Sequence, residues 1–137
     1  MSISDVMTKD PATLDVMSTA ADAALMMRER DIGDVLVTDG EQLCGIVTDR
    51  DIVVRAVAEN RNPIAVTVGE ICSRDVTTLS PNDSVSDAVK LMSDRALRRL
   101  PVVDDGRPVG IVSLGDLAIK EDRESALGQI SAAPPTT

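Results

Sequence analysis

Two short segments, Gly45–Asp51 and Gly110–Asp116, hold the residues of this chain whose types and spacing could do chemistry. They read GIVTDRD and GIVSLGD, so each places an aspartate three positions after a hydroxyl residue. That spacing is typical of a capping box, in which the hydroxyl and the acid satisfy the first amides of a helix. The same turn would suit a ligand, because helix amino ends attract phosphate and a carboxylate can accept both hydrogens of a vicinal diol such as that of ribose. The residues alone leave both interpretations open.

The two segments belong to an internal repeat. Residues 5–55 align without a gap with residues 70–120. The identities in register include Asp10/Asp75, Leu14/Leu79, Asp22/Asp87, Met27/Met92, Gly45/Gly110 and Asp51/Asp116. So many matches at one offset indicate a duplicated structural unit.

The sequence of each repeat predicts the same order of elements, which is β-α-β-β-α with a preceding short helix. Capping-box spacing marks the helix starts, and Asp-Gly between apolar runs marks the hairpins. The predicted opening helices begin at Ser2 and Thr67, and the extended segments are Ala12–Leu14 and Val76–Leu79. The next helices begin at Thr19, with Asp22 three residues on, and at Ser84, with Asp87. The turns are Asp39-Gly40 and Asp105-Gly106, and the second helices start near Asp49 and Leu114. One unit has too small a core to stand alone, so the two repeats are expected to pack together.

The predicted fold class is therefore α+β, with two tandem repeats in one chain. Repeat 1 spans 3–58, a polar linker spans 59–66, and repeat 2 spans 67–121. The remaining tail, 122–137, ends in AAPPTT and is expected to be partly disordered.

The composition narrows the classes of function. The formal charge of −9 makes the chain a poor partner for nucleic acid, whose binding rests on Lys and Arg. There is no His, and two cysteines, Cys44 and Cys72, make neither a disulfide framework nor a zinc site. We therefore expect no catalytic residues, no metal and no required cofactor. The opening MSISDVMTKD lacks the apolar core of a signal peptide, and no apolar run is long enough to span a bilayer, so a cytoplasmic location is expected.

The repeated motif, Gly-apolar-x-Ser/Thr-x-x-Asp at the close of a β-α-β-β-α unit, resembles the ligand motif of cystathionine β-synthase (CBS) domains. The tandem copy resembles a Bateman module. In that family two repeats pack through their sheets about a pseudo-twofold axis and leave two clefts, which bind AMP, ADP, ATP, adenosine or S-adenosylmethionine. The resemblance implies that Thr48 and Asp51 serve one cleft and that Ser113 and Asp116 serve the other, with each aspartate at the ribose.

The resemblance also implies where the adenine base would lie, which is the segment before the long helix of each repeat. The residues concerned are Ala12 and Thr13 in repeat 1, and Thr77 and Thr78 in repeat 2. The chain has no Phe, Tyr or Trp, so an aliphatic and backbone contact with the base fits this composition better than aromatic stacking.

The two predicted sites differ in charge. Arg98 and Arg99 open the hairpin of repeat 2, where the aligned residues of repeat 1 are Gly33 and Asp34. The basic pair resembles the one before the same strand in the last repeat of the AMP-activated protein kinase gamma subunit, where it helps to bind phosphate. A solvated surface pair is the alternative. We favour a phosphate role for Arg99, because an arginine can make a forked contact with phosphate whereas an aspartate repels it.

The function predicted from the sequence is a stand-alone regulatory module that is not an enzyme. An adenine nucleotide or nucleoside would shift packing between repeats or subunits, and the output would pass to an unidentified effector protein. A homodimer is expected from the resemblance and from an apolar helical stripe at Ile52, Val53 and Ala56, repeated at Leu117 and Ala118. The alternative is a structural or interaction homodimer whose clefts are empty and whose motifs act only as helix caps.

Overall fold

A computed structural model describes residues 1–115 and 117 of the chain, which form two compact units. Unit 1 takes Met1–Asp10, Thr77–Asp105 and the described residues from Val109 on, and unit 2 takes Pro11–Val76 and Gly106–Pro108. The predicted tail at 122–137 and the candidate residue Asp116 lie outside the described residues.

Unit 2 is built on a three-stranded sheet of order β2-β3-β4. Strand β2 (Thr13–Asp15) runs parallel to β3 (Asp34–Asp39), and β4 (Gln42–Thr48) returns antiparallel to β3. The hairpin turns at Gly40, whose φ of +65° is open to glycine without steric cost. Its helices are α1 (Ala20–Arg30), α2 (Asp49–Ile52) with a π-helical continuation η2 (Val53–Val57), and α3 (Val68–Ile71).

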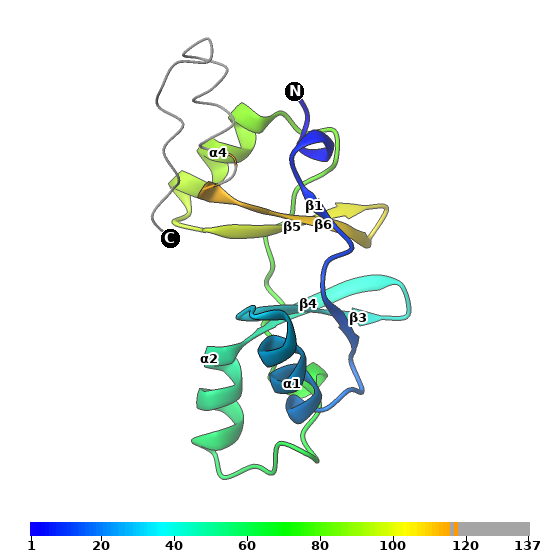
Figure 1. The fold of residues 1–137 in the computed structure, drawn as a ribbon, viewed down its shortest axis with the longest axis vertical. Coiled ribbons are helices and arrows are strands. Elements are labelled where there is room, and N and C mark those ends of the chain that lie inside the picture. The colour runs from blue at the N-terminus through cyan, green and yellow to red at the C-terminus, as the bar shows by residue number, and fades with distance from the viewer. Residues whose placement is uncertain (116, 118–137) are drawn as a thin grey trace. The chain divides into compact units, whose positions relative to one another are not determined.

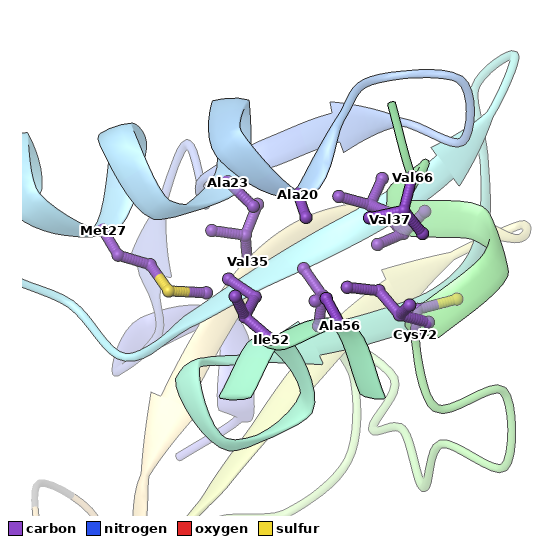
Figure 2. Close-up of a cluster of buried hydrophobic side chains, with 12 residues drawn as sticks. Ala20, Ala23, Met27, Val35, Val37, Ile52, Ala56, Val66 and Cys72 are labelled. Atoms are coloured by element: carbon purple, nitrogen blue, oxygen red, sulfur yellow. The ribbon is translucent and has the colours of Figure 1, made fainter. Parts of the chain in front are cut away.

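The helices of unit 2 bury their apolar faces against one side of this sheet (Figure 2). From α1, Ala23 and Met27 face Val35 of β3, and Ala56 closes the layer from η2. The small residues of α1 let the helix lie close to the strands, which offsets the lack of large aromatic side chains. The predicted start of α1 is confirmed, since Thr19 and Asp22 form a capping box there.

Unit 1 carries the matching elements of the second repeat (Figure 1). Its sheet has the order β1-β6-β5, from β1 (Thr8–Lys9), β6 (Arg107–Ser113) and β5 (Arg99–Asp104). The predicted hairpin turn is confirmed, with positive φ at both Asp105 (54°) and Gly106 (82°), as a two-residue loop favours. Its helices are η1 (Ile3–Asp5) and α4 (Val85–Asp94), and its core includes Ile3, Ala88, Met92, Val102 and Val112.

The opening segment of each repeat packs on the hairpin of the other repeat. Strand β1, from repeat 1, pairs with β6 of repeat 2 through Thr8 and Ile111. In unit 2, Ser73 at the start of repeat 2 pairs with Ile46 of β4, with hydrogen bonds of 2.8 and 2.9 Å in the two directions. Each unit therefore joins residues that are distant in the sequence.

The extended segment predicted at Val76–Leu79 is wrong in extent, because Leu79 alone forms a β-bridge, to Val102. In repeat 1 the longer strand is held by Leu36, whose amide donates to the carbonyl of Ala12 (2.9 Å). The aligned residue of repeat 2 is Pro101, which has no amide hydrogen to donate. The strand pairing is therefore shorter in repeat 2.

Candidate functional site

The Thr48–Asp51 turn is a complete capping box. Strand β4 ends at Thr48, and α2 begins at the next residue. The Thr48 amide donates to Oδ2 of Asp51 (2.9 Å), and the Asp51 amide donates to Oγ1 of Thr48 (3.1 Å). Asp51 is only 9% exposed, so the turn holds a carboxylate in a largely buried position.

The first amides of α2 are already bonded within the protein. The Asp49 amide donates to the carbonyl of Gly33 (3.0 Å), and the Arg50 amide donates to Oδ1 of Asp49 (2.8 Å). The Asp51 amide donates to Oγ1 of Thr48, so all three amides are bonded to oxygens of the protein, and one of these oxygens belongs to a carboxylate. A phosphate at this helix end would have to displace them against a negative charge, so the repeat-1 turn is poorly suited to phosphate.

The corresponding turn of repeat 2 has a different electrostatic character. Strand β6 ends at Ser113, which is half-buried, and Leu114 and Gly115 stand where repeat 1 has Asp49 and Arg50. A leucine supplies no carboxylate for the next amide or against an incoming anion. The predicted ribose residue of this turn, Asp116, lies outside the described residues.

The residues before each hairpin meet the turn of the same repeat. The Leu114 amide donates to the Arg98 carbonyl (2.6 Å), matching the bond from Asp49 to Gly33 in repeat 1. The backbone of the predicted phosphate residues Arg98 and Arg99 is thus held beside the end of β6, and both side chains are exposed. In repeat 1, Asp34 lies directly opposite Thr48 in the β3–β4 register.

The residues predicted to meet adenine lie on the far side of the central strand from the turn. In unit 2, β2 and β4 flank β3, so Ala12 and Thr13 are separated from Thr48 by the first residues of β3. Ala12 is half-buried and Thr13 is exposed. In unit 1, Thr77 is half-buried and Thr78 is exposed.

Two arginines that the sequence did not single out touch the predicted site residues. Arg95, at the end of α4, donates from Nη1 to Oγ1 of Thr77 (3.3 Å). Arg55, on η2, has its Nε 3.8 Å from Oδ1 of Asp51. The sequence did contain a signal for each arginine. Arg55 follows Asp51 by one helical turn, and Arg95 has an identical counterpart, Arg30, in repeat 1.

The motif glycines are required by close backbone packing. A Cβ at Gly45 would lie 2.8 Å from the carbonyl oxygen of Ser73, and one at Gly110 would lie 2.9 Å from that of Thr8. Any larger residue would push away the opening segment that pairs with the hairpin. The glycine of the motif therefore serves the fold, whereas the hydroxyl and the aspartate shape the turn.

Within residues 1–115 and 117, no group of three or more potential metal ligands is arranged to hold a metal ion. No helix in the same part of the chain is long and apolar enough to cross a membrane. Both cysteines are free thiols, and burial raises the pKa of Cys72 above its ordinary value.

Known sequences and structures share this architecture. The CBS domain family matches the chain twice, at residues 3–58 and 68–120. The chain is 40% identical over 134 residues to the CBS domain-containing protein YhcV of Bacillus subtilis, covering 95% of both chains.

Two solved structures with this fold carry bound groups. Hypoxic Response Protein I, with two coordinated zinc ions, has a TM-score of 0.77 and 32% identity over 86% of this chain and 97% of its own. The CBS domain pair of MJ0100, in complex with 5′-methylthioadenosine and S-adenosyl-L-methionine, has a TM-score of 0.75 and 29% identity over 90% of this chain and 98% of its own. With two family matches spanning most of its length, this chain belongs to the CBS domain family and contains a tandem pair of CBS domains.

Proposed function

We propose that this CBS pair is a regulatory module that binds adenosyl ligands, among them adenosine, S-adenosylmethionine, AMP, ADP or ATP. The observation that carries the proposal is the carboxylate of Asp51, a residue only 9% exposed, at a strand-to-helix turn. The MJ0100 pair, which shares the fold, was solved with two adenosyl compounds bound, and this likeness supports the ligand class.

The capping box and ribose binding are compatible uses of one carboxylate. Oδ2 of Asp51 accepts the Thr48 amide, which leaves Oδ1 as the oxygen that can accept a ribose hydroxyl. The cap fixes the orientation of the carboxylate before a ligand arrives, so little side-chain entropy is lost on binding. The same carboxylate can therefore cap the helix and bind a ligand.

We further propose that the two sites accept different ligands. In repeat 1, Asp34 and Asp49 surround the turn with negative charge, which favours an uncharged or cationic adenosyl group. In repeat 2, Arg95, Arg98 and Arg99 lie within five consecutive residues and are all exposed. Because a guanidinium can bond two phosphate oxygens at once, this site is the one expected to accept AMP, with Ser113 and Asp116 as its motif residues.

The proposed role is regulatory and non-catalytic, with a separate effector protein receiving the signal in the cytoplasm. Ligand binding would change the packing between repeats or subunits. Free thiols, one of them buried, fit a reducing compartment. No cofactor is needed for this role.

We also propose a homodimer, on a basis that differs from the predicted stripe. Ile52 and Ala56 are buried in the core of unit 2, so they cannot form an interface. The neighbouring valines Val53, Val54 and Val57 are 58%, 45% and 56% exposed. A second copy covering these apolar side chains would gain hydrophobic stabilisation.

The competing proposal is a structural or interaction homodimer without a physiological nucleotide. The completeness of the capping box and the bonded amides of α2 favour it, because the turn of repeat 1 needs no ligand to satisfy its polar groups. Ligand titration separates the two proposals.

The experiment compares AMP and adenosine on four proteins by isothermal titration calorimetry. A charge-assisted hydrogen bond contributes about 1.5–3 kcal/mol, so Arg99→Ala should weaken AMP roughly ten- to a hundredfold and leave adenosine nearly unchanged. Asp116→Ala should weaken both ligands at the repeat-2 site, and Asp51→Ala should leave AMP binding there almost intact. An Arg99→Ala protein that loses adenosine as severely as AMP would show that Arg99 supports the fold. Loss of AMP in Asp51→Ala, with retention in Asp116→Ala, would reverse the assignment of the two sites.

A further inference from the structure

Arg55 connects the Asp51 carboxylate to the end of helix α3. Its Nη1 donates to the carbonyl oxygens of Ile71 (3.1 Å) and Cys72 (3.4 Å), while its Nε lies 3.8 Å from Oδ1 of Asp51. All of these groups belong to unit 2: Asp51 lies on α2, Arg55 lies on η2, and the two carbonyls lie at the end of α3. One side chain therefore contacts both the motif and the segment that opens repeat 2.

An arginine suits this position for two physical reasons. A largely buried carboxylate needs a nearby cation, and the last carbonyls of a helix need donors that the helix itself does not supply. The planar guanidinium can serve both with different nitrogens, which a lysine ammonium on its flexible stem does less well. The Arg55 side chain is half-exposed and remains partly hydrated. It can therefore contact Asp51 and the α3 carbonyls without the cost of a fully buried ion pair.

The position of Arg55 is also marked by local backbone geometry and by the repeat. Arg55 is the middle residue of the π-helical turn Val53–Val57, and π-helical turns within helices occur frequently at functional sites. In the second repeat the residue four positions after the motif aspartate is Lys120, so both repeats place a basic residue there in the sequence.

We propose that Arg55 is a positioning residue that holds Oδ1 of Asp51 for a ribose hydroxyl of the ligand and ties that carboxylate to the carboxyl end of α3. The ligand half of this inference rests on the proposed function; the α3 half stands on the contacts alone. A ligand that binds Asp51 would favour the arrangement in which Arg55 contacts this carboxylate. In the same arrangement Arg55 donates to the carbonyl oxygens at the end of α3. By reciprocity, a ligand at Asp51 should then stabilise the end of α3.

The first arm of the test compares adenosine with 2′,3′-dideoxyadenosine by calorimetry, in an Asp116→Ala background so that the repeat-1 site reports. Arg55→Met keeps an apolar stem of similar length, and Arg50→Met is a matched control on the same helix whose side chain is exposed. Arg55→Met should weaken adenosine roughly tenfold with little effect on the dideoxy compound, since only the former carries the diol. Arg55→Lys should restore part of the loss. Equal losses for both compounds in Arg55→Met would overturn the positioning role.

The second arm measures amide hydrogen exchange without ligand. The Cys72 amide donates to the carbonyl of Val68 (2.8 Å), and the Ser73 amide donates to that of Ile46 (2.8 Å). Both amides should exchange faster in Arg55→Met and at the wild-type rate in Arg50→Met. Unchanged exchange in Arg55→Met would refute the link to α3. If wild type binds no adenosine, the proposed function fails, and this arm still decides the link between Arg55 and α3.

Discussion

At the scale of single residues, Asp51 shows why a motif can be recognised from sequence while its use is not decided there. Hydroxyl-x-x-Asp predicts a helix start, and the structure contains that cap at Thr48. The same spacing places a carboxylate at the end of a strand, where we propose that a ligand binds. Spacing along the chain does not show that the Thr48 amide takes Oδ2 and leaves Oδ1, nor that Nε of Arg55 lies 3.8 Å from Oδ1.

The role of Gly45 was likewise hidden in the sequence, because its neighbour Ser73 comes from the opening of the other repeat. We predict that Gly45→Ala destabilises the fold by about 1–3 kcal/mol, since the new Cβ meets a backbone oxygen that cannot move alone. Gly33→Ala is the matched control, because its Cβ would meet only the carboxylate end of Asp49 at 3.3 Å. Urea denaturation followed by circular dichroism measures both; equal stability of Gly45→Ala and wild type would contradict the packing argument.

At the scale of elements, helix starts and hairpin turns were predictable because their signals are local. Thr19 and Asp22, and the Asp105-Gly106 turn, lie where their residue types predict. The helical stripe was less predictable. Ile52 and Ala56, one turn apart, do lie on one face, but that face is the core side, and Val53 lies on the exposed side. Periodicity identifies a face without showing what covers it.

Helix α3 gives a pH-dependent prediction. The Thr67 amide, then its hydroxyl and then Arg61, hold the pKa of Glu70 below its ordinary value of 4.5. The Glu70 carboxylate is protonated more readily in the unfolded chain than in the folded protein. The stabilisation of the fold by ionised Glu70 is therefore present above pH 4.5 and is lost as the pH falls through the lowered pKa. Glu70→Gln should therefore be less stable than wild type at neutral pH, and the difference should shrink on acidification. Urea midpoints across this pH range measure it; a gap that widens in acid would contradict the assignment.

At the scale of the whole molecule, the repeat predicted two matching bodies but not which segments they share. Capping boxes and hairpins are satisfied equally well whether an opening segment packs on its own repeat or on the other. The exchange of these segments, seen in the pairing of β1 with β6, is decided by contacts between distant residues. No local pattern encodes that choice, and Asp116 stays a prediction because it lies outside the described residues.

The exposed valines of η2 predict an association that can be broken by charge. A homodimer should have about twice the chain mass of 14.5 kDa by light scattering. Val53→Glu with Val57→Glu should yield monomers, because burying two carboxylates in an interface is costly. Ile64→Glu, at a residue 74% exposed outside η2, is the control and should stay dimeric. A wild-type mass near that of one chain at all concentrations would refute the dimer.

Adenosyl binding is tested most directly by calorimetric titration of ligand-free wild-type protein. The protein is first unfolded and refolded, and the released fraction is checked for adenine absorbance, which no Trp, Tyr or Phe of the chain obscures. We expect saturable heat with adenosine and with AMP, and loss of the repeat-1 component in Asp51→Ala. An absence of heat with AMP, ADP, ATP, adenosine and S-adenosylmethionine, together with no adenine in the released fraction, would contradict it and leave the motifs as helix caps.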